Sequence, residues 1–155
     1  QSWRFVQGTY ATEPIPAAQA SATQPISGTV TATVTPPAPA TPYFLNSAAT
    51  TNGALILTGT SSLHSFYATN TGASVAYVKL YNKATAPTVG TDIPEMIIPV
   101  PAAVGGVPGV ANPNTGFIPF RFALGLGIAI TGGAADNDTT AVAAGQVKVK
   151  LSRST

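Results

Sequence analysis

Charge is the first thing that this sequence lacks. Only 8% of its 155 residues are Asp, Glu, Lys or Arg, against about 25% in an average soluble domain. Solubility must therefore come from Thr, Ser, Asn and Gln, unless partners cover much of the surface. Low charge also lets identical or neighbouring subunits pack without like-charge repulsion. The composition therefore indicates a component of an assembly, and a homo-oligomer is expected.

Clusters of basic residues and long apolar runs are also missing. The formal net charge is +2, and the Lys and Arg residues are spread over separate segments. Because neutralising several phosphates takes several positioned cations, a nucleic-acid partner is not expected. No apolar run approaches the ~20 residues of a membrane span, so a membrane partner is not expected either.

Cysteine is absent, which excludes disulfides, thiolate catalysis and zinc–thiolate sites. The single histidine, His64, is the one candidate base for a nucleophile, but it lies inside an expected strand, where a structural role is the simpler interpretation. Among the five acids, a hydrolase would have to pair Asp92 or Glu95 with Asp136. No motif supports that pairing, so neither an enzyme nor a cofactor is expected.

One stretch has the character of a metal site. Residues 136–140 read Asp-Asn-Asp-Thr-Thr, and alternating oxygen side chains in a loop are able to ligate calcium. The spacing of an EF-hand is missing, and Asp and Asn also favour simple turns. We therefore expect a turn and no metal site, and leave open whether Asp136 and Asp138 bind a cation.

Residues 1–53 are predicted to form an extended arm. Most of this region is Ala, Thr, Pro, Ser, Gln and Gly, and the stretch 35–42 holds four prolines in eight residues. Proline favours extended, polyproline-like chain over helix or central strand. Only residues 29–35 alternate well enough to pair as a strand. The alternative is a disordered tail, but the aromatic residues Trp3, Phe5 and Tyr10 favour an arm that anchors in a partner's pocket.

Residues 54–155 are predicted to form an all-β domain. Most of its short segments alternate between apolar and polar residues, as strands with one buried face do, the first is a short apolar run, and Gly, Pro and Asn separate them. The segments are 54–58, 63–69, 75–81, 95–100, 118–122, 126–130 and 147–151. In the second of them, Phe66 and Ala68 are expected on one face, and Leu63 and Tyr67 on the other. This spacing predicts an antiparallel β-sandwich, jelly-roll-like, with the extended arm at its N-terminus.

Two features of this domain are candidates for binding. Tyr67, Tyr77 and Tyr81 share a strand parity and are able to form an aromatic face for a sugar, although core packing or a subunit contact is the simpler interpretation. The loop from 101 to 115 is long and uncharged, and such loops often bind partners. It is equally compatible with a passive connection.

Several runs resemble a known type of domain. The chain reads FYATNTG at 66–72, AYVKLYNK at 76–83 and ATAPTVGTDIP at 84–94; the segments 122–131, 138–145 and 147–151 continue the pattern. Together they resemble a β-domain found in virion proteins of tailed bacteriophages, over residues 60 to 151. The resemblance rests on strands and turns, and it carries no functional residues to transfer.

The resemblance implies a jelly-roll-like capsid decoration (cement) protein. Its partners would be the major capsid protein or other virion proteins, and it would sit on the capsid exterior after assembly in the host cytoplasm. The alternative is a tail, fibre or adsorption domain that binds a host receptor or glycan. Under either hypothesis the arm and the contact surfaces are the functional parts.

Overall fold

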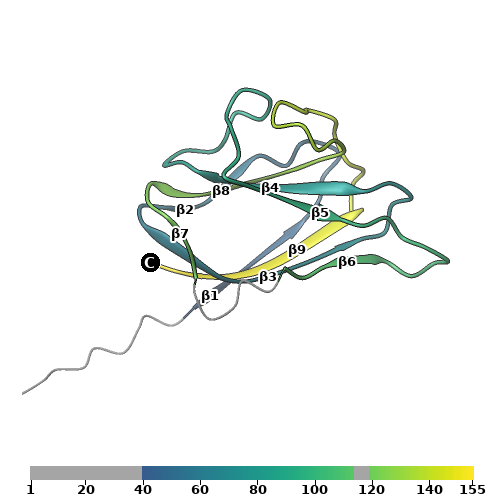
Figure 1. The fold of residues 1–155 in the computed structure, drawn as a ribbon, viewed down its shortest axis with the longest axis horizontal. Coiled ribbons are helices and arrows are strands. Elements are labelled where there is room, and N and C mark those ends of the chain that lie inside the picture. Colours follow the sequence, from purple (N-terminus) through teal and green to yellow (C-terminus); the bar gives the residue numbers. More distant parts are fainter. Residues whose placement is uncertain (1–39, 114–118) are drawn as a thin grey trace, which may run out of the picture. The chain divides into compact units, whose positions relative to one another are not determined.

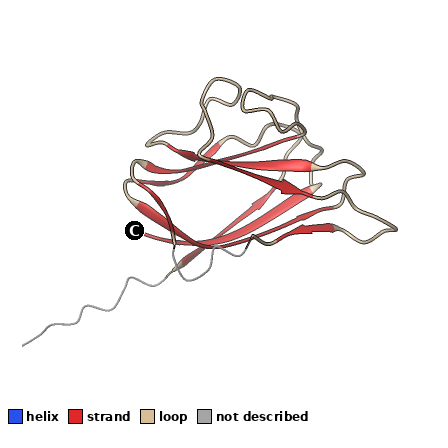
Figure 2. Ribbon diagram, viewed as in Figure 1, coloured by secondary structure: helices blue, strands red, loops and turns tan. Residues whose placement is uncertain are grey.

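The computed structural model describes residues 40–113 and 119–155, which contain strands and loops but no helix. Figure 2 shows the strands in two layers that face each other. The strands are β1 (Thr41–Asn46), β2 (Ala54–Thr58), β3 (Ser61–Asn70), β4 (Ala76–Asn82), β5 (Met96–Val100), β6 (Gly109–Ala111), β7 (Phe120–Phe122), β8 (Gly125–Thr131) and β9 (Val147–Ser154). The expected all-β fold with two antiparallel sheets is confirmed for these residues.

The strands are ordered so that distant parts of the chain pair. One sheet has the order β1-β9-β3-β6, with the short β7 also paired to β3, and the other has the order β2-β8-β4-β5 (Figure 1). The pairs β1–β9, β2–β8, β3–β6 and β4–β5 are therefore nested inside one another along the chain. Strand β5 lies at a sheet edge, a position compatible with Pro99, which has no N–H to donate to a neighbouring strand.

The core lies between the two sheets. The five-stranded sheet contributes Leu63, Phe66, Ala68, Val147, Val149 and Leu151, and the four-stranded sheet contributes Val78, Leu80, Ile98, Val100, Leu126, Ile128 and Ile130. These are the apolar positions of the alternating segments. Each fully buried Leu, Ile or Phe stabilises the fold by about 1.5–3 kcal/mol, so this layer is the main source of stability.

The sandwich begins earlier than the boundary expected at residue 54. Strand β1 pairs with β9 along its whole length, from Thr41 opposite Arg153 to Asn46 opposite Lys148. Pro42 is tolerated because β1 is an edge strand. The strand expected at 29–35 and the rest of the arm up to residue 39 lie outside the described residues.

The expected face of Leu63 is wrong, because a bulge shifts the register of β3. Leu63 lies opposite Arg153, but Ser65 lies opposite the adjacent Ser152, which leaves His64 as the extra residue. In a regular strand, residues three apart point to opposite faces. The extra residue of the bulge shifts this alternation by one position, so the side chains before and after it that are three apart share a face. Leu63 and Phe66 therefore both point into the core, where Leu63 is fully buried.

Two loops cover the outer face of the four-stranded sheet, which was expected to face water. They are residues 83–95 and 132–146, seen above β8 and β4 in Figure 1. The loops also contact each other: Gly90 has a φ of +91°, and an added Cβ there would lie 2.5 Å from Cγ2 of Thr139. As a result Lys79 and Tyr81, whose side chains alternate with the core positions of β4, are fully buried.

Candidate functional site: an aromatic groove on the five-stranded sheet

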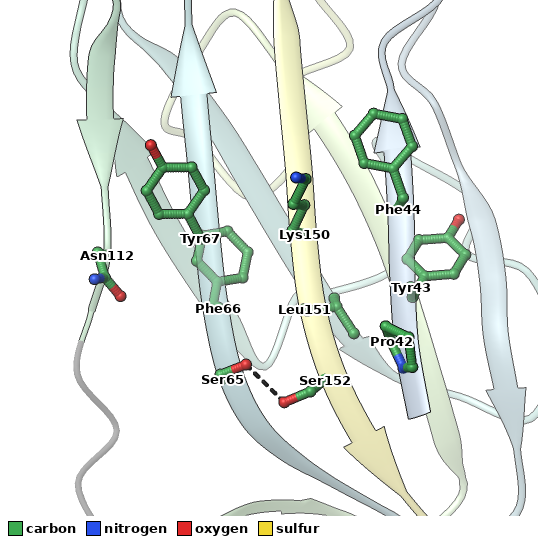
Figure 3. Close-up of a pocket in the computed structure, with 10 residues that line it drawn as sticks. All are labelled: Pro42, Tyr43, Phe44, Ser65, Phe66, Tyr67, Asn112, Lys150, Leu151 and Ser152. Carbon is green, nitrogen blue, oxygen red and sulfur yellow. Dashed lines mark hydrogen bonds between the residues drawn. The ribbon is translucent and has the colours of Figure 1, made fainter. Parts of the chain in front are cut away.

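The outer face of the five-stranded sheet carries a groove across three strands. In the strand register, Phe44 of β1 lies opposite Lys150 of β9, and Lys150 lies opposite Tyr67 of β3. The next row of the same face contains Pro42, Ser152 and Ser65. The groove has a volume of about 580 Å³ and is lined by Pro42, Tyr43, Phe44, Ser65, Phe66, Tyr67, Asn112, Lys150, Leu151 and Ser152 (Figure 3).

Two exposed aromatic rings border the groove. Phe44 is 55% exposed and Tyr67 is 42% exposed, and Figure 3 shows the two rings on either side of the Lys150 side chain. The Lys150 ammonium lies 6.0 Å from the centre of the Phe44 ring. At an exposed site such a cation–π contact contributes about 0.5–1 kcal/mol, enough to favour one position of the lysine.

The polar groups of the groove include several hydrogen-bond donors. Lys150 supplies an ammonium, Tyr67 a phenol and Asn112 an amide, while the hydroxyls of Ser65 and Ser152 are 2.6 Å apart and bonded to each other. No carboxylate and no imidazole belongs to this lining. The groove thus offers flat apolar surface together with donors, which suits a ligand that has apolar faces and free acceptor oxygens.

The three tyrosines predicted to share a face do not lie together. Tyr67 lies on the open face of β3, whereas Tyr77 and Tyr81 belong to β4 in the other sheet. Tyr77 is half-buried and Tyr81 is fully buried. Burial raises the pKa of the Tyr81 phenol, as do the negative charges of Asp92 and Asp136. The prediction of one tyrosine face is wrong because parity along each strand does not reveal which sheet the strand joins.

The loop with Asp136 and Asp138 is organised around a lysine. The Nζ of Lys79 donates to the backbone carbonyls of Ala135 at 2.6 Å, Asp138 at 3.2 Å and Asp136 at 3.4 Å. Burial lowers the pKa of Lys79, and the two aspartates oppose that effect. An internal ammonium therefore lies where these carbonyls converge.

The carboxylate of Asp138 is itself used within the turn. It accepts hydrogen bonds from the backbone N–H of Gly133 at 2.9 Å and from the hydroxyl of Thr140 at 2.8 Å. Partial burial alone would raise its pKa, but the bonds from Thr140 and Gly133 and the charge of Lys79 lower it overall. The simple turn expected here is the arrangement observed. Within the described residues, no group of three His, Cys, Asp or Glu side chains is placed to hold a metal ion.

The residues weighed for hydrolysis have structural contacts. The Nε2 of His64 lies 2.8 Å from the hydroxyl of Ser154. Asp92 forms an ion pair with Lys83 and accepts a hydrogen bond from the backbone N–H of Thr88 at 2.6 Å. The bond from Lys83 and the one from Thr88 hold the pKa of Asp92 below its usual value.

The segment predicted as a loop from 101 to 115 contains more structure than expected. Gly105 and Gly106 have φ values of +58° and +80°, and they form a tight turn in which Val104 and Val107 exchange two backbone hydrogen bonds at 3.0 Å. Strand β6 follows and pairs with the end of β3. The residues of this segment from 114 onward lie outside the described part.

The aromatic residues predicted to anchor the arm, Trp3, Phe5 and Tyr10, lie outside the described residues. Conversely, Phe44 and Lys150, which line the candidate site, were not predicted from the sequence. The signal for Phe44 was present, because Tyr43 and Leu45 alternate with Pro42, Phe44 and Asn46 as in a strand with one buried face. The surrounding Ala, Thr and Pro residues outweighed that short pattern.

Comparison with known proteins adds no relative to this description: no protein-family model matches the chain, and no curated protein matches it. Among the described residues, none form a helix long and apolar enough to cross a membrane.

Proposed function

We propose that the protein is a structural component of a bacteriophage particle, which decorates or cements the capsid exterior through its N-terminal arm and through contacts between subunits. The observation that carries this proposal is the nesting of the strand pairs β1–β9, β2–β8, β3–β6 and β4–β5. Nested strand pairs in two sheets favour a jelly roll, an architecture that recurs in viral capsid and lectin domains. In this proposal β7 is a short addition to β3.

The surface of the protein supports an assembly role. Few charges are available to keep copies apart. The open face of the five-stranded sheet exposes Phe44 of β1, Tyr67 of β3 and Val110 of β6. Exposed aromatic residues of this kind are enriched in the central parts of protein interfaces. The partners in this proposal are the major capsid protein or other virion proteins, and other copies of the chain.

Particle localisation tests the proposal. Purified phage particles are labelled with an antibody against the protein and viewed by electron microscopy, and label over the capsid shell is the expected result. A truncation that lacks residues 1–39 keeps β1 intact and should leave the circular dichroism spectrum of the β-sandwich unchanged while shell attachment is lost. Attachment at normal occupancy would contradict the role of the arm, and absence from the particles would contradict the whole proposal.

A second candidate function is a tail, fibre or adsorption domain that binds a host receptor or glycan. The observation that favours it is the groove itself, where the Phe44 and Tyr67 rings border the Lys150 ammonium. Sugars offer apolar ring faces and acceptor oxygens that would suit this lining. A glycan array with the wild type, Tyr67→Ala and the distant control Val104→Ser tests it, and binding lost only in Tyr67→Ala, together with label on the tail, is the result expected from this candidate.

A further inference from the structure

We propose that the groove binds the proline-rich segment 35–39 of a second copy of this chain. The proposal deepens the proposed function, on which it rests, by naming the partner for one subunit contact. The segment reads Thr-Pro-Pro-Ala-Pro, so Pro36 and Pro39 have the spacing of a P-x-x-P motif. Segments of this type dock as extended polyproline helices in grooves lined by aromatic side chains.

The shape of the groove suits an extended chain. The rings of Phe44 and Tyr67 stand on β1 and β3, with only β9 between them. Neighbouring strands lie about 4.8 Å apart, so the backbones that carry the two rings are about 10 Å apart. Lys150 stands between the rings (Figure 3), and the lining continues along the strands through the row of Pro42, Ser152 and Ser65.

The hydrogen-bonding groups of the two surfaces are complementary. A polyproline helix has no internal hydrogen bonds, and its prolines offer carbonyl acceptors without N–H donors. The groove supplies donors that face solvent: the phenol of Tyr67, the ammonium of Lys150 and the amide of Asn112. Charge does not oppose the contact, because residues 14–42 include no Asp, Glu, Lys or Arg.

The occupant is a second copy because the chain's own segment cannot turn back into the groove. Strand pairing begins at Thr41, opposite Arg153, which leaves Ala40 as the only residue between Pro39 and β1. A reversal of the chain takes a turn of four residues with two at its centre. The segment of a neighbouring copy has no such constraint.

Cross-linking of the full chain tests which copy occupies the groove. Tyr67→p-benzoylphenylalanine keeps an aromatic ring at this position and is made in two batches, one labelled with ¹⁴N and one with ¹⁵N. After mixing and irradiation, mass spectrometry should find Tyr67 of one isotope joined to residues 35–39 of the other. Cross-links within a single isotope only, cross-links elsewhere, or none at all would overturn the proposal.

A mixing experiment tests the two halves of the contact. Phe44→Ser with Tyr67→Ser removes the groove's rings, and Pro36→Gly with Pro37→Gly and Pro39→Gly removes the extended segment. Each variant should self-associate about tenfold or more weakly in sedimentation, and an equimolar mixture should recover heteromers, because one intact groove and one intact segment remain. No weakening, or no recovery, would overturn the proposal.

Two controls separate this inference from the proposed function. Val104→Ser removes an apolar side chain outside the groove that is more exposed than either ring, and it should self-associate like the wild type. Attachment to phage particles is then measured for the groove variant. If the mixed-isotope cross-link is absent but the wild type still labels the capsid, this inference fails and the proposed function stands. A sugar that occupies the groove while the segment does not would overturn the inference in favour of the glycan-binding candidate.

Discussion

On the outer face of the four-stranded sheet, Lys79 and Tyr81 have no exposed surface, whereas on the outer face of the five-stranded sheet Phe44 and Tyr67 are 55% and 42% exposed. All four side chains occupy the same kind of position, alternating along a strand with core residues. The difference comes from the loops 83–95 and 132–146, which lie over one face. Alternation in a strand therefore identifies the core side, but not whether the other side meets water.

The outer face of the four-stranded sheet also carries small residues that leave room for the covering loops. On β8, the residues that alternate with the core positions are small: Gly127 and Ala129 are fully buried beside Lys79 and Tyr81. An added Cβ on Gly127 would lie 3.1 Å from the ring of Pro87 in the covering loop. On the open face the corresponding positions of β9 are Lys148 and Lys150, whose long polar side chains suit solvent. The first face is built for internal packing, and the second is left exposed.

The largest expected effect is on the covered face, in Lys79→Met. The substitution keeps the length of the side chain but leaves the carbonyls of Ala135, Asp136 and Asp138 without their shared donor. We expect a loss of about 2 kcal/mol in the free energy of unfolding, measured by urea denaturation. The control Lys148→Met, on the open face, should change it by less than about 0.5 kcal/mol. Equal stability of the two variants would show that the loop does not depend on Lys79.

Acid should also weaken the covered face first. The pKa values of Asp92 and Asp138 lie below the usual value of 3.8 in the folded protein. The folded state thus favours the charged form, so the stability from both groups is fully present above that value and is lost as the pH falls below it. The free energy of unfolding of Asp138→Asn should therefore fall less steeply with decreasing pH than that of the wild type. Urea denaturation between about pH 6 and about pH 3, a range that spans the usual carboxyl pKa values, measures it.

The matched control for this pH dependence is Asp136→Asn. Its side chain is exposed in the same loop, and its backbone carbonyl, which faces Lys79, is unchanged by the substitution. A pH profile for Asp136→Asn as shallow as that of Asp138→Asn would contradict the role given to the Asp138 carboxylate.

Substitutions on the open face should alter stability less. Phe44→Ser and Tyr67→Ser each remove a ring that is about half exposed, and Phe44 also loses its contact with Lys150. We expect each to cost about 1 kcal/mol or less, measured by thermal denaturation, while self-association is weakened. If either variant unfolds at a much lower temperature, the open face is part of the folding core and the contrast between the faces fails.

The smallest expected effect is that of Tyr81→Phe. The Tyr81 hydroxyl is buried and has no hydrogen-bond partner among the described residues. Removing a buried polar group that lacks a partner should leave the stability unchanged or raise it slightly. Calorimetry measures the change in melting temperature, and a clear decrease would show that the hydroxyl has a partner, such as a buried water, under the loops.

Much of the sandwich was predictable from local pattern. Strands β2 and β9 begin at the expected residues. The first is a short apolar run that ends before Gly59, and the second alternates clearly between apolar and polar residues. Strand β6 was missed, since three residues carry too little pattern and form a strand only by pairing with the end of β3. Strand β1 was missed because its own alternation is short and the composition around it is that of an extended arm. The candidate groove was missed with it, because Phe44 is one of the two rings.

What the sequence by itself determined is the class of fold and the type of surface: alternating segments bounded by Gly, Pro and Asn form antiparallel strands, and a chain with 8% charged residues has an unusually uncharged exterior. Only the tertiary structure decided which strands meet and which face stays open. The groove joins Phe44 and Tyr67 through Lys150 from the far end of the chain, and Lys79 is buried by loops remote from it in sequence. The groove and the burial of Lys79 both depend on contacts between segments that are distant in the sequence. Alternation within one strand shows which side of that strand a residue faces, but not which strand lies beside it.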